Sequence, residues 1–231
     1  MNIVITGASR GIGFETAKFL SNDSNNIVIT ISRDMEQLKK LANESAPGKV
    51  VPIAFDLSGS VDTFNELQRQ IHEHIDRVDV LINNAGYLVN KPFEEIDELD
   101  MELVFKVNLF GIIKLSQILL PSMGGDVPSH IVNIGSMGGY QGSDKFAGLS
   151  LYSASKGAVA TLSECMAEEF GERNIKVNCL ALGAVQTEML SKAFPGYVAP
   201  VQAVDMGRYI AEFAIKGIKK FNGEVIPIEL G

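Results

Sequence analysis

The fold is decided by the stretch Thr6-Gly7-Ala8-Ser9-Arg10-Gly11-Ile12-Gly13, which leaves a β-rich run at Asn2–Thr6 and enters a segment with helical spacing. Glycine adopts the positive φ angles that tight turns need, and it lets a helix pack closely against a strand. A strand, a glycine-rich turn and a helix in this order begin a βαβ unit. The stretch therefore predicts an α/β protein built on a parallel sheet.

The rest of the chain repeats this alternation of strand and helix. Longer stretches with helical spacing separate the β-rich runs; in residues 61–75, for example, apolar side chains recur at steps of three and four. We expect seven strands in a doubly wound parallel sheet with helices on both faces. The strands are predicted at Asn2–Thr6, Asn26–Ser32, Val50–Asp56, Asp79–Asn83, His130–Ser136, Ile175–Ala181 and Gly223–Leu230.

Two prolines indicate which strands lie at the edges of the sheet. Pro52 falls in the third predicted strand and Pro227 in the seventh. Proline has no N–H to donate to a neighbouring strand, so within a sheet it is confined to edge strands. A strand order of 3-2-1-4-5-6-7 places these two strands at the two edges.

Length and composition narrow the class of protein. A chain of 231 residues can bury one sizeable core, and we expect a single domain over residues 1–231. The 20 basic and 28 acidic side chains give a net charge of −8, which opposes nucleic-acid binding. We expect no membrane span, because no apolar run reaches about 18–20 residues, and no secretion signal at Met1-Asn2-Ile3. Two cysteines are typical of a reducing cytoplasm, so a soluble cytoplasmic protein is expected.

The glycine-rich turn also predicts a ligand. Its glycines let the backbone approach a pyrophosphate, and the following helix offers free N–H groups and the positive end of its dipole. The alternative is an ordinary turn rich in glycine. Because the turn lies in the first βαβ unit, its position favours dinucleotide binding.

Four further segments follow in a specific order and spacing. They are Asn83-Asn84-Ala85-Gly86 after the fourth strand, Asn108 in a long helix, Ser136 after the fifth strand, and Tyr152-Ser153-Ala154-Ser155-Lys156. Together with the G-x-x-x-G-x-G spacing of the turn, they resemble the short-chain dehydrogenase/reductase family over nearly the whole chain. The resemblance implies a Rossmann-type fold and an oxidoreductase that transfers hydride between a nicotinamide cofactor and a carbonyl or secondary alcohol.

The residues around the adenosine ribose favour NADP(H), with NAD(H) as the alternative. Ser32 stands where the resemblance places the carboxylate that would select NAD. Arg33 follows it and Arg10 projects from the glycine-rich turn, and two guanidiniums suit a 2′-phosphate. Asp34 is the competing acidic residue, which we expect to cap the next helix.

The remaining cofactor contacts are implied by the resemblance. Asp56 and Leu57 would bind the adenine, although Asp56 could instead cap the loop that follows it. The Val185 backbone and the Thr187 hydroxyl would hold the nicotinamide carboxamide. The full set of expected cofactor residues is Gly7, Ser9, Arg10, Gly11, Ile12, Gly13, Arg33, Asp56, Leu57, Asn84, Ala85, Gly86, Tyr152, Lys156, Val185 and Thr187.

Tyr152 and Lys156 are the expected centre of catalysis. On a helix, a spacing of four residues places both side chains on one face, about 6 Å apart along the axis. A phenol with a pKa near 10 is a poor acid or base at neutral pH, and we expect the nearby ammonium to lower that pKa by about three units. In isolation, such a pair is usually a packed tyrosine and a solvated lysine. Ser136, sixteen residues upstream of Tyr152, favours the catalytic interpretation.

The resemblance assigns a role to each catalytic residue. Ser136 would hydrogen-bond the carbonyl oxygen of the substrate, and Tyr152 would protonate it. Lys156 would hold the ribose hydroxyls of the nicotinamide, and Asn108 would hold a water that connects Lys156 to solvent. No Cys/His cluster has zinc spacing, so no metal is expected.

The chain departs from the family in the region that should cover the substrate. Leu182 replaces the proline of the family's P-G-x-x-x-T segment, and the stretch from Glu188 to Ala203 is short for a substrate lid. A shorter lid implies a more open pocket. Both directions of the reaction and many carbonyl substrates, including 3-oxoacyl thioesters, are compatible with these residues. A non-catalytic redox sensor or scaffold that binds NAD(P) is the alternative from another class.

Two kinds of partner are considered besides the small-molecule carbonyl or alcohol. Acyl-carrier proteins are acidic, and Arg173 and Lys176 could supply a basic docking patch. The resemblance also implies a homodimer or homotetramer that pairs the long helices at Glu94–Leu120 and Leu151–Arg173. In the second helix, we expect Val159, Leu162, Met166 and Phe170 to face the partner, and Ala158 and Cys165 to face the sheet.

Overall fold

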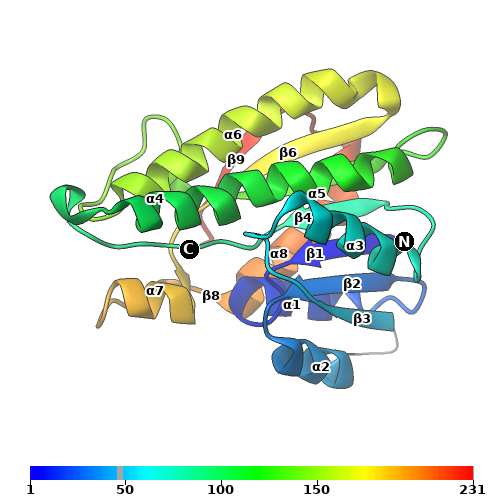
Figure 1. Cartoon of the computed structure of the whole chain (residues 1–231), viewed down its shortest axis with the longest axis horizontal. Coiled ribbons are helices and arrows are strands. Elements are labelled where there is room, and N and C mark those ends of the chain that lie inside the picture. Colours follow the sequence, from blue (N-terminus) through cyan, green and yellow to red (C-terminus); the bar gives the residue numbers. More distant parts are fainter. Residues whose placement is uncertain (46–48, 231) are drawn as a thin grey trace.

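The computed structural model describes residues 1–45 and 49–230, and its centre is a parallel sheet between two layers of helices (Figure 1). Residues 46–48 and 231 of the predicted domain lie outside the described residues. The sheet is built from β1 (Asn2–Thr6), β2 (Ile27–Ser32), β3 (Lys49–Ala54), β4 (Val80–Asn83), β5 (Ser129–Ser136), β6 (Ile175–Leu182) and β9 (Val225–Ile228). The first and last residues of each predicted strand differ from those of the observed strand by at most two positions.

The strand order confirms the topology expected from the sequence. The sheet runs β3-β2-β1-β4-β5-β6-β9, and each pairing in it is parallel. Pro52 lies in β3 and Pro227 in β9, so both prolines are on edge strands. In a parallel sheet all strands end at the same edge, and the loops at that edge are the ones that can form a ligand site.

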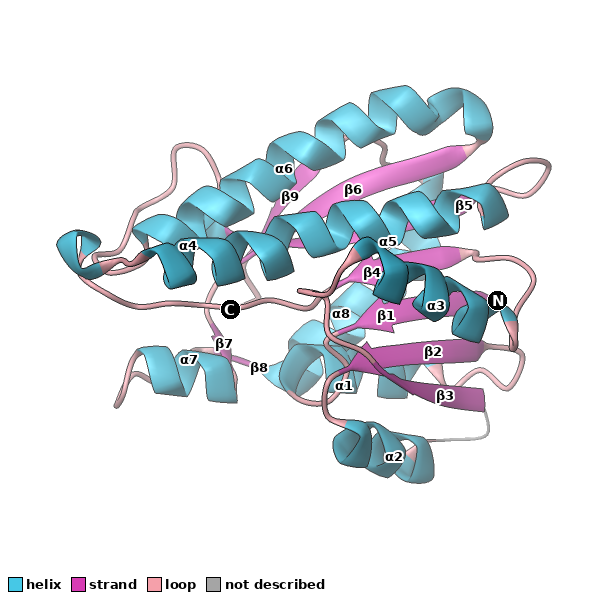
Figure 2. Cartoon of the chain, in the orientation of Figure 1, coloured by secondary structure: helices cyan, strands magenta, loops and turns pink. Residues whose placement is uncertain are grey.

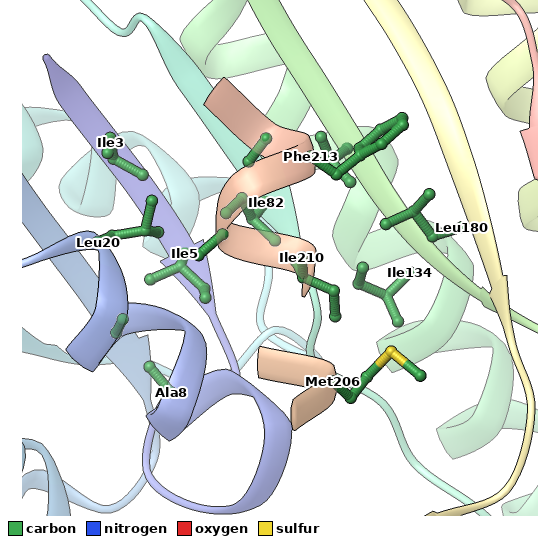
Figure 3. Packing of buried hydrophobic residues seen from close by; sticks show 14 of the residues in the cluster. Ile3, Ile5, Ala8, Leu20, Ile82, Ile134, Leu180, Met206, Ile210 and Phe213 are labelled. Carbon is green, nitrogen blue, oxygen red and sulfur yellow. The ribbon is translucent and has the colours of Figure 1, made fainter. Parts of the chain in front are cut away.

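Helices cover both faces of the sheet (Figure 2). The main ones are α1 (Gly11–Leu20), α2 (Met35–Glu44), α3 (Val61–His72), α4 (Glu98–Phe105), α5 (Gly111–Leu119), α6 (Ser150–Phe170) and α8 (Ala203–Lys216). Buried residues of α1, α2 and α8 share one apolar cluster with Ile5 and its neighbours in the sheet, which Figure 3 shows from close by. Those of α3, α5 and α6 share a second cluster with Val4. The sheet therefore separates two cores.

The longest helical segment, Glu98–Ser122, contains a π-helical turn. It joins α4, the π turn Lys106–Phe110, α5 and a short 3₁₀ turn, and it begins at the Asp97 capping box rather than at the predicted Glu94. By length and mean hydropathy (1.7) it passes a test for a helix that could cross a membrane, although Lys106 and Lys114 interrupt its apolar residues. Its inner face, with Leu115 and Leu119, belongs to the core. An apolar helix packed on a sheet passes the same test of length and composition.

The face that α6 turns to solvent differs from the expected one. Val159 and Met166 are buried against the sheet, whereas Cys165 is exposed. The assignment of faces in this helix was therefore wrong. Apolar residues lie on several sides of α6, so spacing alone did not identify its inner face.

A small second sheet lies beyond the carboxyl end of β6. The two-residue strands β7 (Val185–Gln186) and β8 (Val201–Gln202) pair in parallel, and the short helix α7 (Glu188–Ala193) lies between them. Figure 1 shows α7 and β8 set apart from the main sheet. This region contains the segment from Glu188 to Ala203, which the sequence predicts to be a short lid over the substrate.

Candidate active site

A cleft of about 1010 Å³ opens along the carboxyl edge of the sheet. Each of the expected catalytic and cofactor residues lines this cleft except Asn108, which is buried behind it. The structure therefore brings together residues that are up to 180 positions apart, from Gly7 to Thr187. Parallel topology is the reason, because the turns that follow β1, β2, β4, β5 and β6 meet at one edge.

The glycine-rich turn is closed against the backbone of the neighbouring strand end. Gly7 and Gly11 have φ angles of +69° and +56°, where a side chain would be strained. Asn84 Nδ2 donates to the carbonyls of Thr6 (3.0 Å) and Gly7 (3.2 Å). A Cβ atom at Gly13 would lie only 2.3 Å from the Gly7 carbonyl oxygen. The motifs at residues 6–13 and 83–86 are thus one interlocked unit.

The start of α1 is suited to a phosphate. Its N-cap residue Arg10 makes no side-chain capping bond, and its first turn contains no acidic residue. The first amides of a helix lack partners within it, and the dipole there favours an anion. Together with the glycine cradle, this uncapped end fits the pyrophosphate of a dinucleotide.

A side hollow of about 490 Å³ continues the cleft beyond β2. Arg10 and Arg33 both line it, and Ser32 Oγ donates to Ser9 Oγ at 2.8 Å on its wall. Asp34 caps α2 by accepting from the Gln37 amide at 3.1 Å, as the sequence predicted. Two guanidiniums and two carboxylates therefore line the hollow, and one of the carboxylates, Asp34, caps the helix while Glu36 follows in its first turn.

One of the two arginines has a partner that the sequence did not reveal. Arg10 Nη1 donates to Glu188 Oε2 at 2.9 Å, and Glu188 also pairs with Lys192 in α7. The carboxylate is 49% exposed and the guanidinium 63%, so this ion pair lies at the mouth of the cleft. It connects the glycine-rich turn to the helix on the opposite side.

Asp56 caps its own loop. Its Oδ1 accepts from the Ser58 amide at 2.9 Å and from the Ser58 hydroxyl at 2.8 Å. This is the alternative that the sequence left open, although Asp56 and Leu57 both line the cleft.

Tyr152 and Lys156 lie one turn apart near the start of α6. Lys156 Nζ is 5.8 Å from the centre of the Tyr152 ring and donates to the Ile134 carbonyl at 2.7 Å. Burial lowers the pKa of Lys156 to about 8. Burial raises the pKa of Tyr152 to about 12, and the hydrogen bond with Ser136 opposes this only in part. The expectation that Lys156 lowers the pKa of the Tyr152 phenol is therefore wrong, because the loss of hydration on burial outweighs the opposing effects.

Asn108 lies in the π turn and is fully buried. Its Nδ2 donates to the Tyr87 carbonyl and to Ser155 Oγ, both at 2.9 Å, and its Oδ1 accepts from the Tyr87 amide at 2.7 Å. These bonds occupy both amide hydrogens and leave one lone pair on Oδ1. A Cβ at Gly86 would lie 3.7 Å from both Asn108 Oδ1 and Lys156 Nζ, so only a glycine separates them.

The residues that follow β6 in the chain form the far end of the cleft. Thr187 Oγ1 accepts from the Leu190 amide at 3.2 Å and so caps α7. A Cβ at Gly11 would lie 3.4 Å from Thr187 Cγ2, which places this residue directly across from the glycine-rich turn. The backbone of Val185 is fixed in β7 by pairing with Val201.

Apolar residues that the sequence analysis missed line the rest of the cleft. They come from three separate segments and include Leu88, Phe146, Leu149, Met189, Phe194 and Tyr197. No motif marks them, because they share only their apolar character and their place in the fold.

Comparison with known proteins agrees with this architecture. A sequence profile of the family described as short chain dehydrogenase matches residues 1–197. The chain therefore belongs to the short-chain dehydrogenase/reductase family, a family of oxidoreductases.

Individual relatives include enzymes of several kinds. The chain is 33% identical over 191 residues to the 3-oxoacyl-(acyl-carrier-protein) reductase FabG of Thermotoga maritima, covering 82% of this chain and 76% of that one. It is 35% identical over 188 residues to carbonyl reductase family member 4 of Xenopus tropicalis, covering 80% and 75%. A short-chain dehydrogenase structure from Shigella flexneri in complex with NADP superimposes with a TM-score of 0.88 at 27% identity, covering 98% and 95%.

Proposed function

We propose that this protein is an NADP(H)-dependent oxidoreductase that transfers hydride between the nicotinamide and a carbonyl or secondary alcohol. The observation that carries the proposal is the meeting of Ser136, Tyr152 and Lys156 in the same cleft as the interlocked glycine-rich turn. When bound, a nicotinamide cofactor supplies or accepts the hydride. The chain contributes binding, orientation and proton transfer.

The cofactor would lie along the carboxyl edge of the sheet. The amides at the start of α1 would hold its pyrophosphate, and Arg33 and Arg10 the 2′-phosphate in the side hollow. Lys156 would hold the nicotinamide ribose, and the Val185 backbone and Thr187 the carboxamide. The NADP in the Shigella flexneri relative supports the same choice of cofactor. NAD(H) remains the alternative, because Glu188 already neutralises Arg10.

Tyr152 acts as the proton donor in the direction of reduction. With its pKa at about 12, the phenol is fully protonated at neutral pH and can hydrogen-bond a substrate oxygen. Lys156, with its pKa at about 8, is mostly charged at pH 7 and would stabilise the phenolate left after transfer. Ser136 would share the substrate oxygen, and Asn108 would offer its free Oδ1 lone pair to a water.

The substrate is a small or medium carbonyl compound. The named activities of the relatives, a 3-oxoacyl reductase and a carbonyl reductase, both reduce a C=O group. Docking of an acyl-carrier protein receives no support from Arg173 and Lys176. Lys176 lies at the start of β6 and Arg173 in the 3₁₀ turn just before it, and the eight residues of that strand put both roughly 25 Å from the cleft in one copy of the chain.

Pairing of copies through the long helices is part of the proposal. Leu99, Met101 and Phe110 of the Glu98–Ser122 helix are all about half exposed or more. Figure 1 shows this helix beside α6, so the two form one continuous layer. The exposed apolar side chains of the Glu98–Ser122 helix, beside the more polar outer face of α6, suit a two-fold interface in a cytoplasmic homodimer or homotetramer.

The test is NADPH oxidation against a panel of diketones, aromatic aldehydes, 3-oxoacyl thioesters and keto-steroids. We expect Tyr152→Phe to retain NADPH binding, with the loss of at most the hydroxyl's contact with the cofactor, and to lose turnover by a factor of 10² or more, because general acid catalysis contributes about that much. The chain has no tryptophan whose quenching could report binding, so the fluorescence of NADPH itself is followed. Wild-type protein that binds NADPH but reduces nothing would favour a sensor or scaffold.

A further inference from the structure

The side of the cleft that faces away from the glycine-rich turn is apolar. Six side chains, which we call the substrate-side wall, come from the loop after β4, the loop before α6, and α7 with its following loop: Leu88, Phe146, Leu149, Met189, Phe194 and Tyr197. The expected cofactor residues line the remainder of the cleft. The wall is therefore the part of the cleft left for a substrate.

Several residues of the substrate-side wall expose much of their surface. Phe146 is 60% exposed, Tyr197 49% and Met189 40%. A soluble protein gains stability by burying such side chains, so their gathering at the mouth of a cleft marks a surface that an apolar ligand covers. Two of these three side chains are aromatic, and aromatic rings pack favourably against an aromatic ligand.

The charge beside the wall that has no ion-pair partner among the described residues is negative. Asp144 lines the cleft two residues before Phe146, whereas Glu188, on α7, is paired with Arg10 and Lys192. The neighbouring cation, Lys145, does not line the cleft; its Nζ donates to the Tyr140 carbonyl at 2.7 Å and to the Ser143 carbonyl at 3.1 Å. Within the described residues, the cations that line the cleft are Arg10, Arg33 and Lys156, all on the cofactor side.

We infer that the substrate is an uncharged, apolar carbonyl compound, an aromatic ketone or aldehyde, and that Asp144 disfavours anionic carbonyl compounds such as keto acids. The inference rests on the proposed function and narrows it to one substrate class. The inference follows from the apolar character of the substrate-side wall and from the negative charge of Asp144 beside it. An apolar group gains from the wall, whereas a carboxylate loses its hydration there and meets another carboxylate without a compensating cation.

The test compares binding of two probes, methyl 4-acetylbenzoate and 4-acetylbenzoate, which share one ring and ketone and differ in charge and by the ester methyl group. Calorimetric titration in the presence of excess NADP⁺ measures binding without turnover, because a ketone and an oxidised cofactor cannot react. We expect the ester to bind at least ten-fold more tightly than the carboxylate. Asp144→Lys should reduce this ratio at least five-fold, and Phe146→Ser should weaken the ester about ten-fold.

Phe93→Ser is the matched control, because Phe93 is 78% exposed and does not line the cleft. It should leave both dissociation constants unchanged. Equal or tighter binding of the carboxylate, an unchanged ratio in Asp144→Lys, or no binding of either probe would overturn the inference. Failure of the proposed function looks different: the ester binds as expected, but NADPH oxidation of carbonyls is absent or independent of Tyr152.

Discussion

Gly13→Ala tests whether the glycine-rich turn and the segment after β4 are truly interlocked. The added Cβ would lie 2.3 Å from the Gly7 carbonyl oxygen and 2.4 Å from Asn84 Nδ2, and neither can move alone. Overpacking of this kind costs about 1–3 kcal/mol. The two bonds that Asn84 donates are worth about 1 kcal/mol each, and alanine returns about 1 kcal/mol of helix propensity. The net loss is about 2–4 kcal/mol.

Thermal unfolding and NADPH titration measure the effect. For a domain of this size, 1 kcal/mol corresponds to about 2–4 °C, so Tm should fall by about 5–15 °C. NADPH should bind at least ten-fold more weakly, because the clash displaces the backbone of the cradle. Gly171→Ala is the control: Gly171 is helical, with φ −57°, and a Cβ there meets nothing within 4 Å. A Gly13→Ala variant that melts and binds like the wild type would refute the interlock.

Three further changes test the electrostatics. Arg33→Ala should weaken NADPH at least ten-fold and NADH little, since only NADPH has the 2′-phosphate; equal losses in fluorescence titration would contradict the preference for NADP(H). Glu188→Gln frees Arg10 from an exposed, solvent-screened ion pair, so NADPH should bind about 2–5-fold more tightly, and weaker binding would show that the pair organises the site. Burial lowers the pKa of His130 from 6.5 to about 4. Between these pH values the unfolded chain holds a proton that the folded chain does not, so the free energy of unfolding decreases as pH falls, by at most about 3 kcal/mol. Urea titrations at pH 7 and 4.5 should show a smaller decrease in His130→Gln, and an equal one would contradict this assignment.

Much of the fold could be predicted because local signals agreed with the topology. Continuous apolar runs marked the strands, and Pro52 and Pro227 identified the edges without reference to any motif. The helix faces were less predictable. In α6, apolar side chains lie on several sides, and which side becomes buried depends on packing against β5 and β6 rather than on spacing.

The site could be predicted as far as its residues belong to short motifs. Apart from Asn108, the cofactor and catalytic residues line one cleft because their motifs lie at the same edge of one parallel sheet. Interactions between motifs could not be foreseen. The Arg10–Glu188 pair joins segments 178 residues apart. The raised pKa of Tyr152 depends on burial, which no spacing of residues encodes.

The division of the interior by the sheet has a consequence for how substitutions combine. Val4 and Ile5 are adjacent in sequence, yet each belongs to a different apolar cluster. Ile5 and Ile210 are far apart in sequence but share a cluster. Effects on stability add for residues without shared partners and couple for residues in contact. Substitutions should therefore couple within one face of the sheet: a change at Ile5 should affect which residues are accepted at position 210 more than which are accepted at position 4.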